Sequence, residues 1–212
     1  MASVVQVSHP LVRHHLTRLR DQKTSAAGFR NGLQRLSSLL AYVATQDLDV
    51  REIEVDTPLT TTTGAEVKSV IALVPILRAG LGMVDPILDL IPDAEVWHLG
   101  IYRDEATALP VQYYCKIPPS GPVDVAMVLD PMLATGGSAI AAIETLQDWG
   151  VPKIKLLSVI AASAGVEAVT AQFPDLQLFV CAIDPDLNTR KFIVPGLGDA
   201  GDRAFNTHRA HE

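Results

Sequence analysis

Four short, strongly apolar runs most constrain what this chain can fold into. They lie at residues 70–74, 125–129, 154–160 and 176–183 and are rich in Val, Ile and Leu. Such continuous runs are typical of strands buried on both faces of a sheet. Helical patterns such as residues 138–149 separate them, so the sequence predicts an α/β fold with a central, mostly parallel sheet flanked by helices. In such sheets ligands bind beyond the carboxyl ends of the strands.

Two further segments have a recognisable pattern. Residues 25–45 predict an amphipathic helix, because apolar residues recur there at steps of three and four. That apolar stripe consists of Phe29, Leu33, Leu36, Leu40 and Val43. It faces either the core or a second subunit, and the core is the default interpretation. Residues 56–65, with several Thr between Pro and Gly, predict an exposed loop or hairpin.

Composition limits the class of protein. The 212 residues suit one compact domain, or one domain with a small appendage. The formal net charge of −7 disfavours general binding to nucleic acid. The two cysteines and six histidines have no metal-ligand spacing. The longest uncharged stretch, residues 131–143, is too short to span a membrane, and the first residues do not resemble a signal peptide. We therefore expect a cytoplasmic protein that does not interact with membranes.

The strongest local signal is residues 128–138, Val-Leu-Asp-Pro-Met-Leu-Ala-Thr-Gly-Gly-Ser. It joins a buried strand to the start of a helix. Glycines let backbone N–H groups point inward, hydroxyl groups add donors, and the helix dipole favours an anion. The pattern fits a cradle for one phosphate, and it is not a Walker loop because the Gly-Lys ending is missing. The alternative is an ordinary strand-to-helix turn with Ser138 as the helix N-cap.

Asp130 favours the cradle over the ordinary turn. A carboxylate beside a phosphate would repel it, so Asp130 should face another part of the ligand. Vicinal sugar hydroxyls suit a carboxylate, which accepts two hydrogen bonds at once. Phosphate and ribose together indicate a phosphorylated pentose.

At these residues the sequence resembles the type I phosphoribosyltransferases, which bind 5-phospho-α-ribose 1-diphosphate (PRPP). Asp-Pro in place of two adjacent acids is similar to the uracil branch of that family. Further matching segments are residues 9–12, 74–83, 102–105 and 195–202. The resemblance implies the type I phosphoribosyltransferase fold over residues 1–212. It also implies three parts, namely an N-terminal helical arm at about 10–45, a flap at about 102–120 and a uracil-binding hood at about 184–212.

The resemblance also assigns residues to the ligands. It implies PRPP binding by Arg78 in the loop after the first strand, by Arg103 on the flap, and by Asp199. The rest of the implied PRPP site is Asp130, Pro131, Met132, Leu133, Ala134, Thr135, Gly136, Gly137 and Ser138. Uracil would be read by the main chain of Ile193, Gly198, Asp199 and Ala200, where the many glycines permit close approach. Those glycines are too many for a helix or a central strand.

The implied reaction is uracil plus PRPP giving UMP and diphosphate, with Asp130, Arg78, Arg103 and Asp199 as catalytic residues. Mg²⁺ is expected mainly on the diphosphate, since it prefers phosphate oxygens plus one or two carboxylates. The resemblance further implies a homodimer or higher homo-oligomer, and GTP activation in some members. The alternatives are a PRPP-sensing protein that binds nucleic acid, disfavoured by the charge, and an enzyme that uses a purine.

Two segments depart from the pattern of the family. On the flap, Ala106 and Ala108 stand where acidic residues are expected, and Cys115 stands where Gln is commoner. Residues 162–165 are Ala-Ser-Ala-Gly in place of Ala-Pro-Glu-Gly, and we expect Ser163 to cap the helix that follows.

Overall fold

A computed structural model describes residues 2–103, 110–116 and 121–207. Within these residues a central sheet has seven strands, and every pair is parallel. The strands lie in the order β1-β11-β10-β8-β4-β5, with β9 beside β10. Their bounds are β1 Ser3–Gln6, β4 Ile71–Pro75, β5 Glu95–Val96, β8 Val125–Leu129, β9 Met132–Leu133, β10 Lys153–Ala162 and β11 Gln177–Asp184. The predicted parallel α/β sheet is confirmed.

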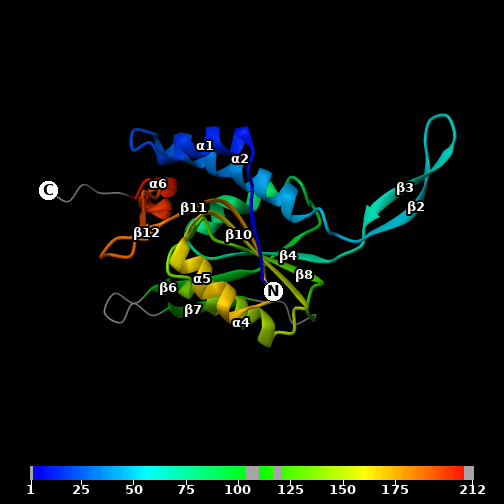
Figure 1. Cartoon of the computed structure of the whole chain (residues 1–212). Helices are drawn as coiled ribbons and strands as arrows, with labels where there is room; N and C mark the ends of the chain where they lie inside the picture. The colour runs from blue at the N-terminus through cyan, green and yellow to red at the C-terminus, as the bar shows by residue number, and fades with distance from the viewer. Residues whose placement is uncertain (1, 104–109, 117–120, 208–212) are drawn as a thin grey trace.

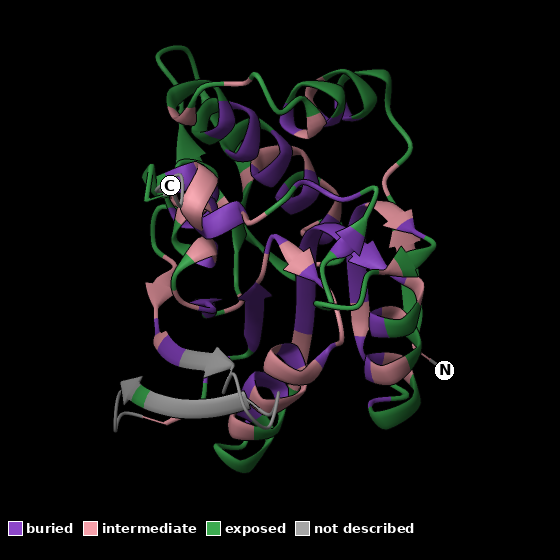
Figure 2. Ribbon diagram, turned by 90° about the vertical axis from the view of Figure 1, so that its left-hand side faces the viewer, coloured by how far each residue is buried: buried purple, intermediate pink, exposed green. Residues whose placement is uncertain are grey.

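Helices cover both faces of this sheet (Figure 1). On one face lie α1 (Pro10–Arg20) and α2 (Ala26–Ala44), and on the other lie α4 (Gly137–Asp148) and α5 (Ser163–Gln172). The core therefore has two layers, one on each side of the strands. Figure 2 shows the molecule from the carboxyl edge of the sheet. The buried strands (purple) lie between helices that combine buried and exposed residues.

The apolar stripe of α2 faces the sheet. Phe29, Leu33, Leu36 and Leu40 are fully buried, and Val43 packs against the same cluster. The interpretation of this stripe as core is confirmed. The helix begins after Ser25, whose hydroxyl accepts a hydrogen bond from the N–H of Gly28.

Small elements gather at the carboxyl edge of the sheet. They are the 3₁₀ helix η1 (Ala79–Met83), α3 (Val84–Leu88), the hairpin of β6 (His98–Arg103) and β7 (Pro110–Lys116), the hairpin of β12 (Asp186–Leu187) and β13 (Ile193–Val194), and α6 (Ala200–Phe205). The expectation that the glycine-rich tail holds no helix is wrong. The six-residue α6 begins there because Asp199 caps it and Ala200 and Ala204 are buried.

A long hairpin extends from the other end of the molecule (Figure 1). We call it the protruding hairpin, residues 50–67, formed by β2 (Val50–Asp56) and β3 (Thr61–Val67). The loop or hairpin predicted at 56–65 is its tip and second strand. In the part of the chain that the structure describes, no helix is long and apolar enough to cross a membrane.

Candidate active site

Asp130 stands directly beyond the carboxyl end of β8, at the centre of the edge. Its main-chain N–H donates to the carbonyl of Leu157 on β10 (3.2 Å), and its Oδ1 accepts from the N–H of Met132 (3.2 Å). Burial raises the pKa of Asp130 to about 7, although the hydrogen bond from Met132 acts in the opposite direction. The hydrogen bond from Met132 thus fixes the direction of the carboxyl group, and burial moves its pKa towards neutral pH.

The turn after Asp130 leads into the first turn of α4. Gly136 is the N-cap of α4 and has φ +87°, a conformation that favours glycine. The alternative in which Ser138 is the N-cap is therefore wrong. Because glycine has no side chain, the first amides of α4 have no capping group from their own N-cap and suit an anion.

Helix α5 packs directly against this turn. A Cβ built on Gly165 would lie 2.4 Å from the carbonyl oxygen of Ala134 and 2.8 Å from that of Leu133. Only glycine fits at such distances without moving the turn. Ser163, expected to cap α5, does not do so. The N-cap is Ala162, and the hydroxyl of Ser163 donates to the carbonyl of Asp184 (3.4 Å).

Arg78 lies beyond the end of β4, which pairs with β8. Its loop packs on the Asp130 strand, because a Cβ on Gly80 would be 2.4 Å from the carbonyl oxygen of Leu129. The peptide bond between Leu77 and Arg78 is cis. The side chain of Arg78 is 57% exposed, and its guanidinium donates to Oδ1 of Asp202 (3.1 Å) and to the hydroxyl of Thr207 (3.4 Å). The strand-end loop and the C-terminal tail therefore meet at Arg78.

The predicted base-reading residues lie in what we call the C-terminal loop, residues 193–200. Ile193 and Ala200 are buried at its ends, and Gly198 has φ +75°. Oδ1 of Asp199 accepts from the N–H of Asp202 (2.8 Å), so Asp199 is the N-cap of α6. A Cβ on Gly201 would lie 3.2 Å from this oxygen and 3.5 Å from the guanidinium of Arg78. The structure thus brings Asp199 next to Arg78.

Arg103 ends β6, opposite Pro110 on β7. This hairpin lies beside β4, where Leu77 N–H donates to the carbonyl of Leu99 (3.2 Å). The side chains of Arg103 and Cys115, and residues 104–109 with Ala106 and Ala108, lie outside the described residues. The diphosphate contact of Arg103 stays a prediction.

Sequence reasoning missed the groups that hold the C-terminal loop from behind. Arg20, at the end of α1, forms a two-pronged ion pair with Asp184, at the end of β11. Arg203 on α6 donates to the carbonyls of Leu197 (2.8 Å) and Asp21 (2.7 Å). Asp184 stands directly after a buried strand, where functional groups were to be sought. No sequence pattern indicates a function for Arg20, since only the fold brings Arg20 to the carboxyl end of β11.

A hollow elsewhere in the molecule does not belong to this site, and the described residues form no metal site. A hollow of about 480 Å³ lies at the amino ends of β10 and β11, near Lys153 and Gln177, far along the strands from Asp130. Among the described residues, no three side chains of His, Cys, Asp or Glu are grouped to hold a metal ion.

The fold and the strand-end site together define a class, the phosphoribosyltransferases of type I. A hypoxanthine-guanine phosphoribosyltransferase from Bacillus anthracis shares the fold at 12% identity and a TM-score of 0.51, over 74% of this chain and 80% of that one. The AQ2163 protein from Aquifex aeolicus is closer, with a TM-score of 0.90 and 37% identity over 95% of this chain and 97% of that one.

Sequence comparison identifies the family within this class. The family model described as uracil phosphoribosyltransferase matches residues 5–207. Relatives with that name are 56% identical in Roseiflexus sp. (strain RS-1), over 98% of this chain and 100% of the relative, and 49% identical in Wolinella succinogenes, over 97% and 99%. The chain belongs to the uracil phosphoribosyltransferase family.

Proposed function

We propose that the protein transfers the phosphoribosyl group of PRPP to uracil, giving UMP and diphosphate. The observation that carries the proposal is the contact of Arg78 with Asp202, which joins the loop after β4 to the C-terminal tail beside the Asp130 turn. This contact supports the proposal, because it joins Arg78, the proposed diphosphate ligand, to the tail proposed to read the base. The family relationship supports the same activity.

In the proposed reaction the bond between the ribose anomeric carbon and the diphosphate oxygen breaks, and a bond from that carbon to a uracil nitrogen forms. Positive charge develops on the ribose, so catalysis depends on positioning and charge stabilisation. The turn from Thr135 to Ser138 holds the 5′-phosphate, and Asp130 accepts hydrogen bonds from the ribose hydroxyls. Arg78 and Arg103 bind the leaving diphosphate.

The C-terminal loop reads the base in this proposal. Carbonyl acceptors and an N–H donor along one edge of uracil match main-chain groups of Ile193, Gly198 and Ala200. Asp199 stabilises the cationic ribose or accepts the uracil proton. The tail from about residue 184 then acts as a uracil-binding hood, and residues 102–120 act as a flap over the diphosphate.

Mg²⁺ fits this site as an ion carried by PRPP. The described residues offer the carboxylate of Asp130 at the turn and no all-protein cluster, which is the donor set that Mg²⁺ commonly uses with phosphates. When bound, the ion neutralises charge on the diphosphate. Asp130 would orient the sugar, and Arg78 would bind the leaving group.

The test is UMP formation from uracil and PRPP, with hypoxanthine, guanine and orotate as competing bases. We expect UMP alone, unaffected by the other three bases. Nucleotide formation from a purine, or a salt-dependent RNA complex without any product, would overturn the proposal and favour one of the two alternatives. Adding GTP to the same assay tests the predicted activation, and fractionating cells tests the predicted cytoplasmic location.

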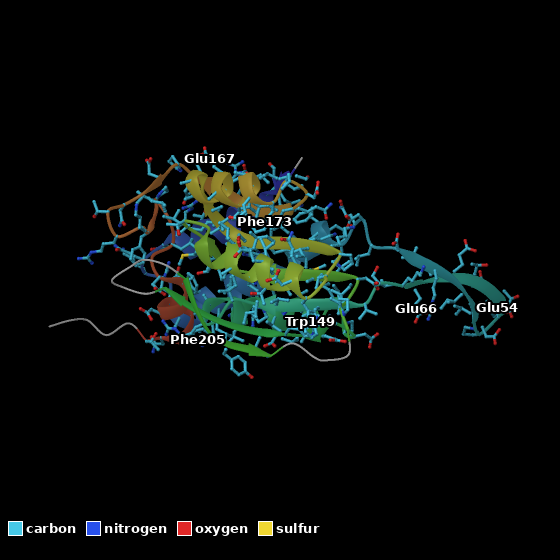
Figure 3. All side chains as sticks on the ribbon, turned by 90° about the horizontal axis from the view of Figure 1, so that it is seen from below. Glu54, Glu66, Trp149, Glu167, Phe173 and Phe205 are labelled. Atoms are coloured by element: carbon cyan, nitrogen blue, oxygen red, sulfur yellow. The ribbon has the colours of Figure 1, made fainter. Side chains whose placement is uncertain are left out.

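We further propose that the protein is a homodimer in which the protruding hairpin docks on the body of a second copy. Figure 3 shows Glu54 and Glu66 on this hairpin, outside the body of the molecule. A two-stranded hairpin alone is marginally stable in water, and this one leaves Val50, Val67 and Leu59 exposed, the last at 96%. Burying them against a second copy removes this apolar surface from water.

Charge complementarity supports the same partner. The hairpin carries four acidic residues and one basic residue, whereas α1 carries three arginines and no acid. Arg13 and Arg18 on α1 are exposed. An acidic hairpin of one copy therefore has a basic surface to meet on the other.

A further inference from the structure

The Arg20–Asp184 ion pair holds both main-chain polar groups of one residue of the C-terminal loop, Gly196. Nη1 and Nη2 of Arg20 lie 2.8 and 2.6 Å from the two carboxylate oxygens of Asp184. Oδ2 of Asp184 also accepts from the N–H of Gly196 (2.9 Å), and Nη1 of Arg20 donates to the carbonyl of Gly196 (3.0 Å). Asp184 is 5% exposed, so these bonds are shielded from water.

The position of Gly196 determines the position of Ile193. Gly196 has φ +65°, and a Cβ built on it would lie only 2.0 Å from the carbonyl oxygen of Ile193. The chain thus turns back tightly on Ile193 at this glycine. Moving the Gly196 peptide therefore moves the main-chain groups of Ile193, and through residue 197 it also moves Gly198.

The Asp130 turn is held by different contacts. Its main chain is fixed by Leu157 on β10, and its middle is packed against Gly165 on α5. Loss of the Arg20–Asp184 pair therefore disturbs the C-terminal loop and leaves the sugar-phosphate cradle in place.

We infer that Asp184 is a positioning residue for uracil, acting with Arg20 through Gly196. This inference rests on the proposed function, because it assigns base reading to the C-terminal loop. Asp184 and Arg20 do not contact the base; they fix the main-chain groups that do. A two-pronged pair between arginine and carboxylate suits this role because it fixes direction as well as distance.

The experiment compares three variants of the full chain. Asp184→Asn keeps the shape but removes the charge that binds Arg20. Arg20→Lys keeps the charge but loses the fork. Asp175→Asn, at an exposed position just before the amino end of β11 and far along that strand from Asp184, is the matched control for loss of one acidic charge. For each variant, kcat, the KM for uracil and the KM for PRPP are measured.

We expect Asp184→Asn to raise the KM for uracil about tenfold, with the KM for PRPP changed less than about twofold. Arg20→Lys should give a smaller change in the same direction, and it decides the matter if Asp184→Asn does not fold. Asp175→Asn should behave as the wild type does.

Equal rises in both KM values would show general damage and overturn the inference, as would an unchanged KM for uracil in both Asp184→Asn and Arg20→Lys. A wild-type protein that makes no UMP would instead remove the proposed function itself. The two failures are therefore distinguishable.

Discussion

The carboxyl group of Asp130 combines burial with a task that requires charge. Burial favours its neutral form, whereas ribose hydroxyls bind best to an ionised carboxylate with free acceptors. The pKa of about 7 places the change between the two forms at neutral pH. In the proposed function, PRPP binds to the ionised form.

This pKa predicts how activity depends on pH. A pKa raised from 3.8 to about 7 means that the ligand-free protein loses its ionised Asp130 as the pH falls below 7. We expect kcat/KM for PRPP to fall about tenfold per pH unit below 7 and to be level above it. Asp130→Asn is the control, and its profile should lack this step. The same step in Asp130→Asn would assign it to PRPP or to another group.

Gly165 permits the close approach of α5 to the Asp130 turn. In Gly165→Ala the added methyl group would meet the carbonyl oxygens of Ala134 and Leu133, so the turn must shift. We expect the KM for PRPP to rise about tenfold while the KM for uracil changes little. Ala164→Ser, on the exposed face of the same helix, is the control. An unchanged KM for PRPP in Gly165→Ala would contradict this prediction, because it would show that the turn shifts without weakening PRPP binding.

At the scale of elements, the junction of α2 with β10 and β11 depends on a buried ammonium group. Lys155 is fully buried, with its Nζ on Asp47 and on the carbonyl of Ala44. Burial would raise the pKa of Asp47, but hydrogen bonds from Lys155, Lys153 and Gln177 outweigh it and hold this pKa well below its ordinary value. Burial lowers the pKa of Lys155, against the attraction of Asp47.

The two partners of this pair should respond differently to substitution. Asp47→Asn leaves a buried ammonium group without its counter-charge and should lower the free energy of unfolding by about 3 kcal/mol. Lys155→Met leaves Asp47, which is 41% exposed, to be hydrated, and should cost about 1 kcal/mol or less. Urea denaturation of both variants measures the difference. Equal costs would contradict the role of burial.

The sequence predicts a strand correctly where both of its faces are buried, because burial then determines its residue pattern. The strands β4, β8, β10 and β11 have continuous apolar runs because both of their faces are covered. The two-residue β5 and β9 are too short for any period, and β1 is mostly exposed, so pattern could not indicate them. In the site, the motif at residues 128–138 is continuous in the sequence, so it can be recognised without the structure. Arg20 and Asp184 are 164 residues apart, and only the folded chain shows that they form a pair.

At the scale of the whole molecule, the site and the protruding hairpin lie at opposite ends (Figure 1). The hairpin proposed for docking is therefore distant from the candidate active site of its own chain. The docking proposed for the hairpin can then be tested without touching any residue of the site.

Removing the hairpin should dissociate the dimer. Val50 and Val67 are paired across its base, so residues 51–66 can be replaced by a two-residue Asn-Gly turn. We expect light scattering to give a dimer for the wild type and a monomer for this variant, with a cooperative melting transition by circular dichroism as the control for folding. A monomeric wild type, or a variant that stays dimeric, would contradict the proposed docking.

The two ligand-holding halves of the site have separate supports. The Asp130 turn is held by the sheet and α5, whereas the C-terminal loop is tied to the end of α1 by Arg20 and Arg203. The loop proposed to read the base can therefore be exchanged, together with its anchors on α1, without altering the turn after Asp130.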